Sequence, residues 1–205
     1  MLVTSLIVLA TGLEAQTPAA SLASTRIILL VDSGTGVQQH YQRIRTGLTE
    51  FLAAMPEDAE VGIISCGGQM RVRLAPTTDR AKQRQAAESF SPDGGANSFL
   101  DALVEADQRF LKNAADKRPV FVVVATDGSS NSEPRIDAYN KFLNDFRQRR
   151  GMAHAVVLRS NQMGLASQVL ENLTQNTGGS IQVLALSNGI PDALKQIAAR
   201  VAAGK

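Results

Sequence analysis

Two aspartates each follow an apolar run that has the composition of a buried strand. Asp32 comes directly after Ile-Leu-Leu-Val (28–31), and Asp127 comes directly after Val-Val-Val-Ala-Thr (122–126). Ligand sites of parallel α/β sheets lie beyond the carboxyl ends of the strands, at the point where the strand order reverses. Two carboxylates at such an edge could ligate a divalent cation, act as acid and base, or cap turns and helix ends.

Short polar residues and glycines accompany both aspartates and a third loop. The glycines leave backbone N–H groups open, and such groups can accept an anion. The two aspartates are the candidate metal ligands, and the predicted binding rim as a whole comprises Asp32, Ser33, Gly34, Thr35, Gly36, Asn97, Ser98, Asp127, Gly128 and Ser129.

Apolar, β-branched runs predict the strands that must position this rim. Runs that are apolar at every position indicate strands covered on both faces. Residues 70–74 (MRVRL) alternate instead and follow two glycines, which predicts an edge strand paired antiparallel, with Arg71 and Arg73 facing water. The other predicted strands are 27–31, 61–66, 120–125, 155–158 and 181–186.

Apolar residues spaced three and four apart predict helices between the strands. These stripes run over 37–55, 99–110, 136–146, 165–173 and 190–201. Strands that alternate with helices indicate right-handed crossovers. We therefore expect an α/β fold: a doubly wound, mainly parallel six-stranded sheet with one antiparallel edge strand and helices on both faces.

Composition and motif spacing disfavour several classes of function. The net charge is only +2 and no basic stripe is present, so the pattern does not indicate nucleic-acid binding. Gly34-Thr35-Gly36 lacks the third glycine of a dinucleotide fingerprint, because position 39 is Gln39. No GxSxG elbow occurs, and two histidines with one cysteine are too few for a zinc cluster. Cys66 lies in an apolar run, which predicts a buried small side chain.

The first residues have the character of an export signal. Residues 2–13 are apolar over a length typical of a signal-peptide core and too short to span a bilayer. No basic residue precedes them, however, and a buried element is the alternative. We expect a signal peptide over 1–15, a linker over 16–25, a domain over 26–205, and an exported protein, periplasmic or secreted, with no transmembrane span.

The ordered set of motifs resembles the von Willebrand factor type A family, in a bacterial form. The resemblance is carried by an apolar strand ending in Asp32, a Gly-Gly segment before Leu-Asp-Ala-Leu (100–103), and Val-Val-Val-Ala-Thr-Asp-Gly (122–128). It extends over nearly the whole chain from residue 26 to about residue 203. It implies the Rossmann-like fold of that family and a role in recognising other proteins.

The resemblance also implies a place for a metal ion. The family commonly holds magnesium at an adhesion site with the pattern Asp-x-Ser-x-Ser, followed by a Thr before the third helix and an Asp after the fourth strand. Asp32 and Asp127 match this pattern. The two serine positions are Gly34 and Gly36, and the threonine position is Asn97, so the predicted site is degenerate.

We therefore expect a non-enzymatic protein-interaction domain, of adhesion or scaffold type, that binds another protein through the rim without a tightly bound cofactor. One alternative is a Mg²⁺-dependent ligand-binding domain that uses Asp32 and Asp127, with the ion held weakly. A second alternative is an acid–base hydrolase that uses the same two carboxylates.

Overall fold

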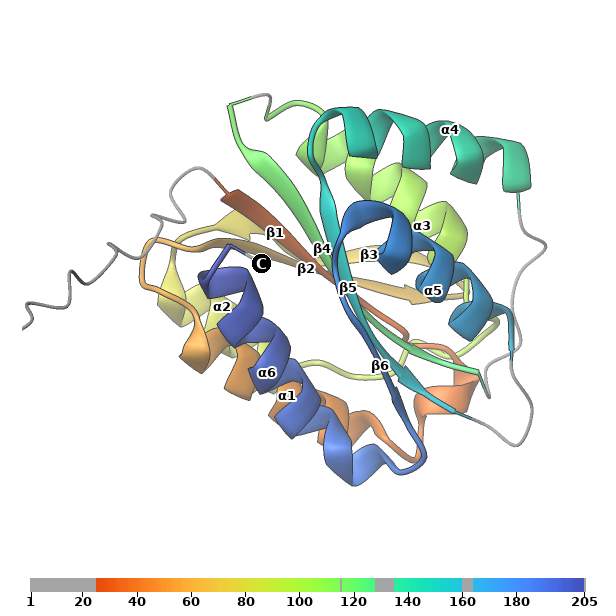
Figure 1. Cartoon of the computed structure of the whole chain (residues 1–205). Coiled ribbons are helices and arrows are strands. Elements are labelled where there is room, and N and C mark those ends of the chain that lie inside the picture. The colour runs from red at the N-terminus through yellow and green to blue at the C-terminus, as the bar shows by residue number, and fades with distance from the viewer. Residues whose placement is uncertain (1–24, 115, 128–134, 160–163, 205) are drawn as a thin grey trace, which may run out of the picture.

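The protein, seen in a computed structural model, has a twisted sheet between two layers of helices (Figure 1). The structure describes residues 25–114, 116–127, 135–159 and 164–204. Within these residues the strands are β1 (Thr25–Val31), β2 (Glu60–Gly67), β3 (Gln69–Thr77), β4 (Arg118–Thr126), β5 (Met152–Leu158) and β6 (Ile181–Leu184). The α-helices are α1 (Tyr41–Ala54), α2 (Arg80–Glu88), α3 (Phe99–Ala106), α4 (Ile136–Gln148), α5 (Leu165–Thr177) and α6 (Ile190–Ala202).

The strand order β3-β2-β1-β4-β5-β6 confirms the predicted sheet. All neighbours pair in parallel except β2 and β3, so β3 is the antiparallel edge strand. Val31 at the end of β1 pairs with Ser65 on one side and Val124 on the other. The carboxyl ends of these strands are therefore level, and the chain order reverses between β1 and β4.

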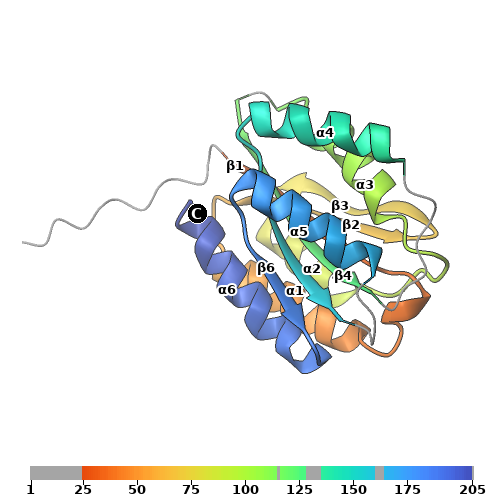
Figure 2. The same ribbon diagram turned by 45° about the vertical axis from the view of Figure 1, so that its right-hand side comes forward.

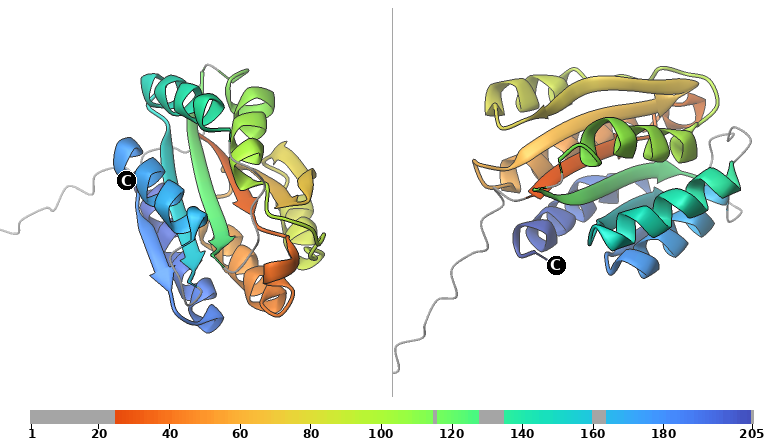
Figure 3. Two further views of the ribbon diagram at one scale, coloured as in Figure 1. Left: turned by 90° about the vertical axis from the view of Figure 1, so that its right-hand side faces the viewer. Right: turned by 90° about the horizontal axis from the view of Figure 1, so that it is seen from above.

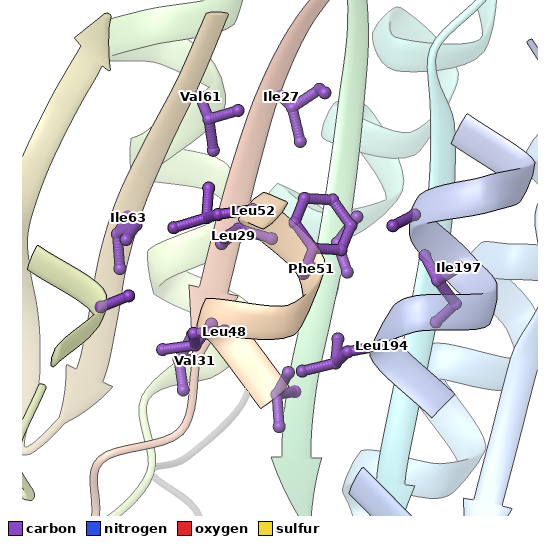
Figure 4. Close-up of a cluster of buried hydrophobic side chains, with 14 of the residues drawn as sticks. Ile27, Leu29, Val31, Leu48, Phe51, Leu52, Val61, Ile63, Leu194 and Ile197 are labelled. Atoms are coloured by element: carbon purple, nitrogen blue, oxygen red, sulfur yellow. The ribbon is translucent and has the colours of Figure 1, made fainter. Parts of the chain in front are cut away.

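Alternation along the strands divides the apolar core between the two faces of the sheet. Ile27, Leu29 and Val31 pack toward α1 and α6, where Phe51 of α1 is fully buried (Figure 4). The alternate residues of β1, Ile28 and Leu30, pack on the other face, toward α3, α4 and α5. Figures 2 and 3 show a helical layer on each face. Because both faces are covered, the central strands are apolar at nearly every position.

Three local features differ from the sequence-based expectation. The first stripe begins with a short 3₁₀ turn, Thr35–Val37, and α1 starts only at Tyr41. The last strand ends at Leu184, two residues earlier than expected, because residues 187–189 form another 3₁₀ turn. Helix α2 was not predicted, because its side chains are polar along most of its length and form no apolar stripe.

The predicted signal peptide and almost all of the predicted linker lie outside the described residues. Thr25, assigned to the linker, is the first residue of β1. In the described part of the chain, every helix is too short or too polar to cross a membrane.

Candidate functional site

The predicted rim lies where the carboxyl ends of β1, β4 and β5 meet (Figure 2). The backbone N–H of Asp32 donates to the carbonyl of Val124 at 2.7 Å, and that of Asp127 donates to the carbonyl of Leu158 at 3.0 Å. The chain leaves β1 toward α1 on one face and later enters α4 on the other face. The two aspartates thus flank the point where the strand order reverses, as the sequence predicted.

Asp32 is fully buried and joins two strands. Its Oδ1 accepts a hydrogen bond from Gly34 N at 2.9 Å, and its Oδ2 accepts one from Thr126 N at 3.3 Å. The first bond is a local turn, and the second connects the end of β1 to the end of β4. This carboxylate therefore shapes the rim from beneath and is not part of its exposed surface.

Asp127 is half-buried and caps a distant helix. Its Oδ1 accepts from Ser167 N at 3.0 Å and its Oδ2 accepts from Ser167 Oγ at 2.6 Å. Helix α5 has no capping side chain of its own at Gly164, so Asp127 satisfies an N–H group of its first turn. Ser167 was not predicted from the sequence, because its partner lies 40 residues earlier in the chain.

Two amides of the Gly34–Gly36 loop, those of Gly34 and Thr35, donate hydrogen bonds within the protein. Thr35 N donates to the Gly95 carbonyl at 3.0 Å, and Val37 N donates to the Gly34 carbonyl at 3.2 Å. With the bond from Gly34 N to Asp32, these contacts leave little of the open anion-binding nest that the glycines suggested. A Cβ at Gly34 would lie 2.9 Å from the Gly95 carbonyl oxygen, so close packing of two loops requires glycine there.

Asn97 and Ser98 are buried at the start of α3. The Oδ1 of Asn97 accepts from Phe99 N at 2.9 Å and from the Cys66 thiol at 3.5 Å. Among the described residues, its Nδ2 and the Ser98 hydroxyl have no hydrogen-bond partner. Burial, followed by the negative charges of Asp32 and Asp93, raises the pKa of Cys66 well above its ordinary value. Cys66 is thus a buried thiol, as expected.

These residues do not fit a tightly held magnesium ion. Mg²⁺ requires oxygen ligands near 2.0–2.1 Å in an octahedral arrangement. The oxygens of Asp32 and Asp127 already accept bonds from protein donors, and Gly34 has no room for a hydroxyl-bearing side chain. Asn97 has its oxygen engaged, and its remaining atom is a donor. Among the described residues no group of three His, Cys, Asp or Glu could hold a metal ion. Gly128 and Ser129 lie outside the described residues.

A polar groove opens at the rim beside these buried groups. It has a volume of about 390 Å³. Its described lining contains no acidic side chain, and Arg159 is its exposed cation. Burial lowers the pKa of His40, which favours the neutral ring. The groove can therefore receive polar or negatively charged groups, and its lining residues are Thr35, Gly36, Gln38, Gln39, His40, Thr126, Leu158 and Arg159.

A buried carboxylate that was not predicted from the sequence lies in the loop before α3. Asp93 accepts from the Ser33 hydroxyl at 2.7 Å and forms an ion pair with Arg73 at 2.7 Å. The expectation that Arg73 faces water was wrong, because the loop before α3 covers it. Arg71 is exposed as expected, and it also reaches Asp93 at 3.2 Å. We call Ser33, Ser65, Arg71, Arg73 and Asp93 the Asp93 cluster.

Comparison with known proteins identifies a family. The sequence profile described as "von Willebrand factor type A domain" matches residues 27–131. No curated protein sequence matches the chain.

Solved structures share the fold at low sequence identity. A von Willebrand factor type A protein from Catenulispora acidiphila has a TM-score of 0.70 and 14% identity over 89% of this chain and 43% of its own. Manganese-loaded TRAP protein of Plasmodium vivax has a TM-score of 0.60 and 13% identity over 87% and 75%. The pilus adhesin SpaC from Lactobacillus rhamnosus GG, in an open conformation, has a TM-score of 0.66 and 14% identity over 87% and 30%. The chain thus spans under half the length of the first and third of these.

Proposed function

Because the chain belongs to the von Willebrand factor type A domain family, we propose that it is a non-enzymatic domain that binds another protein at the rim groove without a tightly bound metal ion. The observation that carries the proposal is the groove itself. It lies at the point of strand-order reversal, where sheets of this class bind their ligands. It is also open and polar, and such a surface suits contact with a protein side chain.

The chemistry of the groove favours an acidic partner group. Arg159 is exposed, and the described lining has no carboxylate to neutralise it. Arginine binds carboxylates through two parallel N–H donors, and complementary charge speeds association. We therefore infer that an Asp or Glu of the partner enters the groove beside Arg159.

The state of the two aspartates argues for binding that needs no metal and no catalysis. Asp32 is fully buried and accepts hydrogen bonds on both oxygens, so it has no access to a substrate. Asp127 accepts two hydrogen bonds from Ser167, which gives it a capping role at the start of α5. An acid–base pair would instead need carboxylates that face the groove.

We also propose that the domain is exported from the cytoplasm. The apolar leader over 1–15 and the similarity of the fold to a pilus adhesin are consistent with a domain that acts outside the cytoplasm. Proteomic detection of an N-terminus near residue 16 in the secreted or periplasmic fraction is the result that we expect; a mature N-terminus at Met1 in the cytosol contradicts it.

Site-specific photo-crosslinking tests the binding surface. A photoreactive residue at Gln39, in the groove, should capture a partner both in excess EDTA and in excess MgCl₂. The matched control is the same residue at Gln148, which is exposed at the far end of α4. The captured protein is then purified, and its affinity is measured by calorimetry for the wild type, Arg159→Glu and Arg147→Glu.

Charge reversal at Arg159 should weaken binding of the partner by about tenfold or more. Charge reversal at the exposed Arg147 should change the affinity little. Capture at Gln148 and not at Gln39 would contradict the groove. Capture that requires MgCl₂, or saturable Mg²⁺ binding that is lost in Asp32→Ala, would favour the metal-dependent alternative.

A further inference from the structure

The Asp93 cluster connects four segments that form one side of the rim. Ser33 follows β1, Ser65 lies near the end of β2, Arg73 lies on β3, and Asp93 lies in the loop before α3. Asp93 Oδ2 accepts from the hydroxyls of Ser33 at 2.7 Å and Ser65 at 2.8 Å. The Asp93 carboxylate therefore contacts a side chain from each of the other three segments.

Arg73 binds the other side of this centre. Its Nη2 lies 2.7 Å from Asp93 Oδ1 and also donates to the Ser91 carbonyl at 3.0 Å, and its Nε donates to Ser65 Oγ at 2.9 Å. The guanidinium also lies over the Phe90 ring, 5.7 Å from the ring centroid. The Asp93 side chain is only 4% exposed, so its charge requires an internal partner.

Backbone contacts extend the connection from the carboxylate to the glycine loop. Asp93 N and Gly94 N both donate to the Ser33 carbonyl, at 2.8 and 2.9 Å. A Cβ at Gly67 would lie 2.6 Å from that carbonyl group, so β2 passes directly against the same turn. The position of the Gly34–Gly36 loop is therefore set by the segment that Asp93 anchors.

The electrostatics favour a permanently charged cluster. Burial alone would raise the pKa of Asp93, but the Ser33 and Ser65 hydroxyls and the Arg73 guanidinium together hold it below its ordinary value. A positive charge and a negative charge thus meet between the rim loops. Arg71 adds a second, exposed cation at 3.2 Å.

We propose that the Arg73–Asp93 ion pair holds the rim loops in place of a bound divalent cation. The residues act as positioning residues, because they fix the Ser33–Gly36 turn and the start of the loop before α3. The rim of this chain is consequently ordered with no metal ion, whatever partner it binds. The rim of this chain thus differs from a site in which a bound metal ion links the loops.

Amide hydrogen exchange of the full chain, followed by NMR, tests this proposal without a partner. The reporters are the N–H groups of Thr35, Asp93 and Gly94, and the internal reference is Asp32 N, which is bonded to β4. In Arg73→Met the reporters should exchange about tenfold faster or more, while the reference stays protected, since only the loops open. The matched control Arg71→Met contacts the same carboxylate from the surface and should leave all four amides nearly unchanged.

Two further variants keep the test decisive if Arg73→Met does not fold. Arg73→Lys retains the charge but loses the Nε donor to Ser65, so its exchange should be faster than that of the wild type. The substitution Asp93→Asn is made both in the wild-type chain and in the Arg73→Lys variant. It should accelerate exchange by a larger factor in the wild-type chain, because the two residues act as a pair.

Divalent ions provide the remaining outcome. Wild-type exchange should be the same in excess EDTA and in excess MgCl₂. Slower exchange of the reporters in MgCl₂, or equal effects of Arg73→Met and Arg71→Met, would overturn the proposal. The partner does not enter this experiment, so its result is independent of the proposed binding function.

Discussion

His154 is a buried histidine that should couple the stability of this fold to pH. It lies on β5, is 1% exposed, and accepts a hydrogen bond at Nδ1 from the Ser180 amide at 3.2 Å. Its Nε2 has no hydrogen-bond partner in the part of the chain that the structure describes. Burial, followed by the positive charges of Arg200 and Arg118, lowers the pKa of His154 from 6.5 to about 4. The folded protein therefore keeps this ring neutral over a range in which the unfolded chain is protonated.

The sign of the effect follows from this difference. Between pH 6.5 and about 4 the unfolded state binds more protons than the folded state, so the free energy of unfolding falls as the pH falls. The stabilisation is fully present above pH 6.5 and is lost progressively below it. The complete effect is about 3 kcal/mol, and about 2 kcal/mol of it should be lost by about pH 5, above most carboxylate titrations.

Urea unfolding at a series of pH values measures this loss. His154→Gln retains an acceptor for the Ser180 amide but cannot be protonated, so its stability should fall far less than that of the wild type above about pH 5. His40→Gln is the control, because it removes the other histidine of the chain and should keep most of the wild-type loss. An NMR titration that places the pKa of His154 near 6.5, or a full loss of stability in His154→Gln, would refute the reasoning.

Two further predictions concern close packing and buried charge. Gly34→Ser brings a Cβ within 2.9 Å of a backbone carbonyl, so it should lower the free energy of unfolding by about 1–3 kcal/mol and confer no Mg²⁺ binding by calorimetry. Gly189→Ser, whose Cβ would lie 3.4 Å from its nearest neighbour, is the control, and equal stability of the two variants would contradict the clash. Arg149→Met leaves Asp107 buried without the Nη2 donor that contacts both of its carboxylate oxygens, at 2.7 and 2.8 Å, and should lower the free energy of unfolding in urea by about 3–5 kcal/mol. Arg109→Met breaks an exposed pair and should cost at most about 1 kcal/mol; a similar loss in both would show that burial of Asp107 does not matter.

The sheet could be predicted because the residues of each strand indicate whether its two faces are covered. A strand covered on both faces must be apolar throughout, and residues 120–125 satisfy this condition with no reference to the rest of the chain. The level carboxyl ends of parallel strands then place the loops after β1 and β4 together. The location of the rim follows from topology, and its two aspartates were found for that reason.

Helix α2 was missed because its stability comes from polar contacts. Arg80 donates to the Leu52 and Met55 carbonyls at the end of α1, and Gln83 donates to two other backbone carbonyls. Contacts of this kind do not produce a periodic pattern of apolar residues in the sequence. One local signal was available: Asp79 caps the helix by accepting from two amides of its first turn, and residues 80–87 are good helix formers.

The chemical state of the rim could not be predicted because it depends on residues far apart in the sequence. Arg71 and Arg73 are equivalent in the sequence alternation of residues 70–74, but the pairing with β2 shifts register between Val72 and Leu74. Arg71 is exposed, whereas Arg73 is covered by a loop about twenty residues later. Asp93 meets Ser33 across 60 residues. An alternating pattern specifies which face a side chain takes, but a loop from elsewhere decides whether that face meets water. The same carboxylates could therefore have bound an ion, and what argues against it here is the set of internal donors that the fold brings to them.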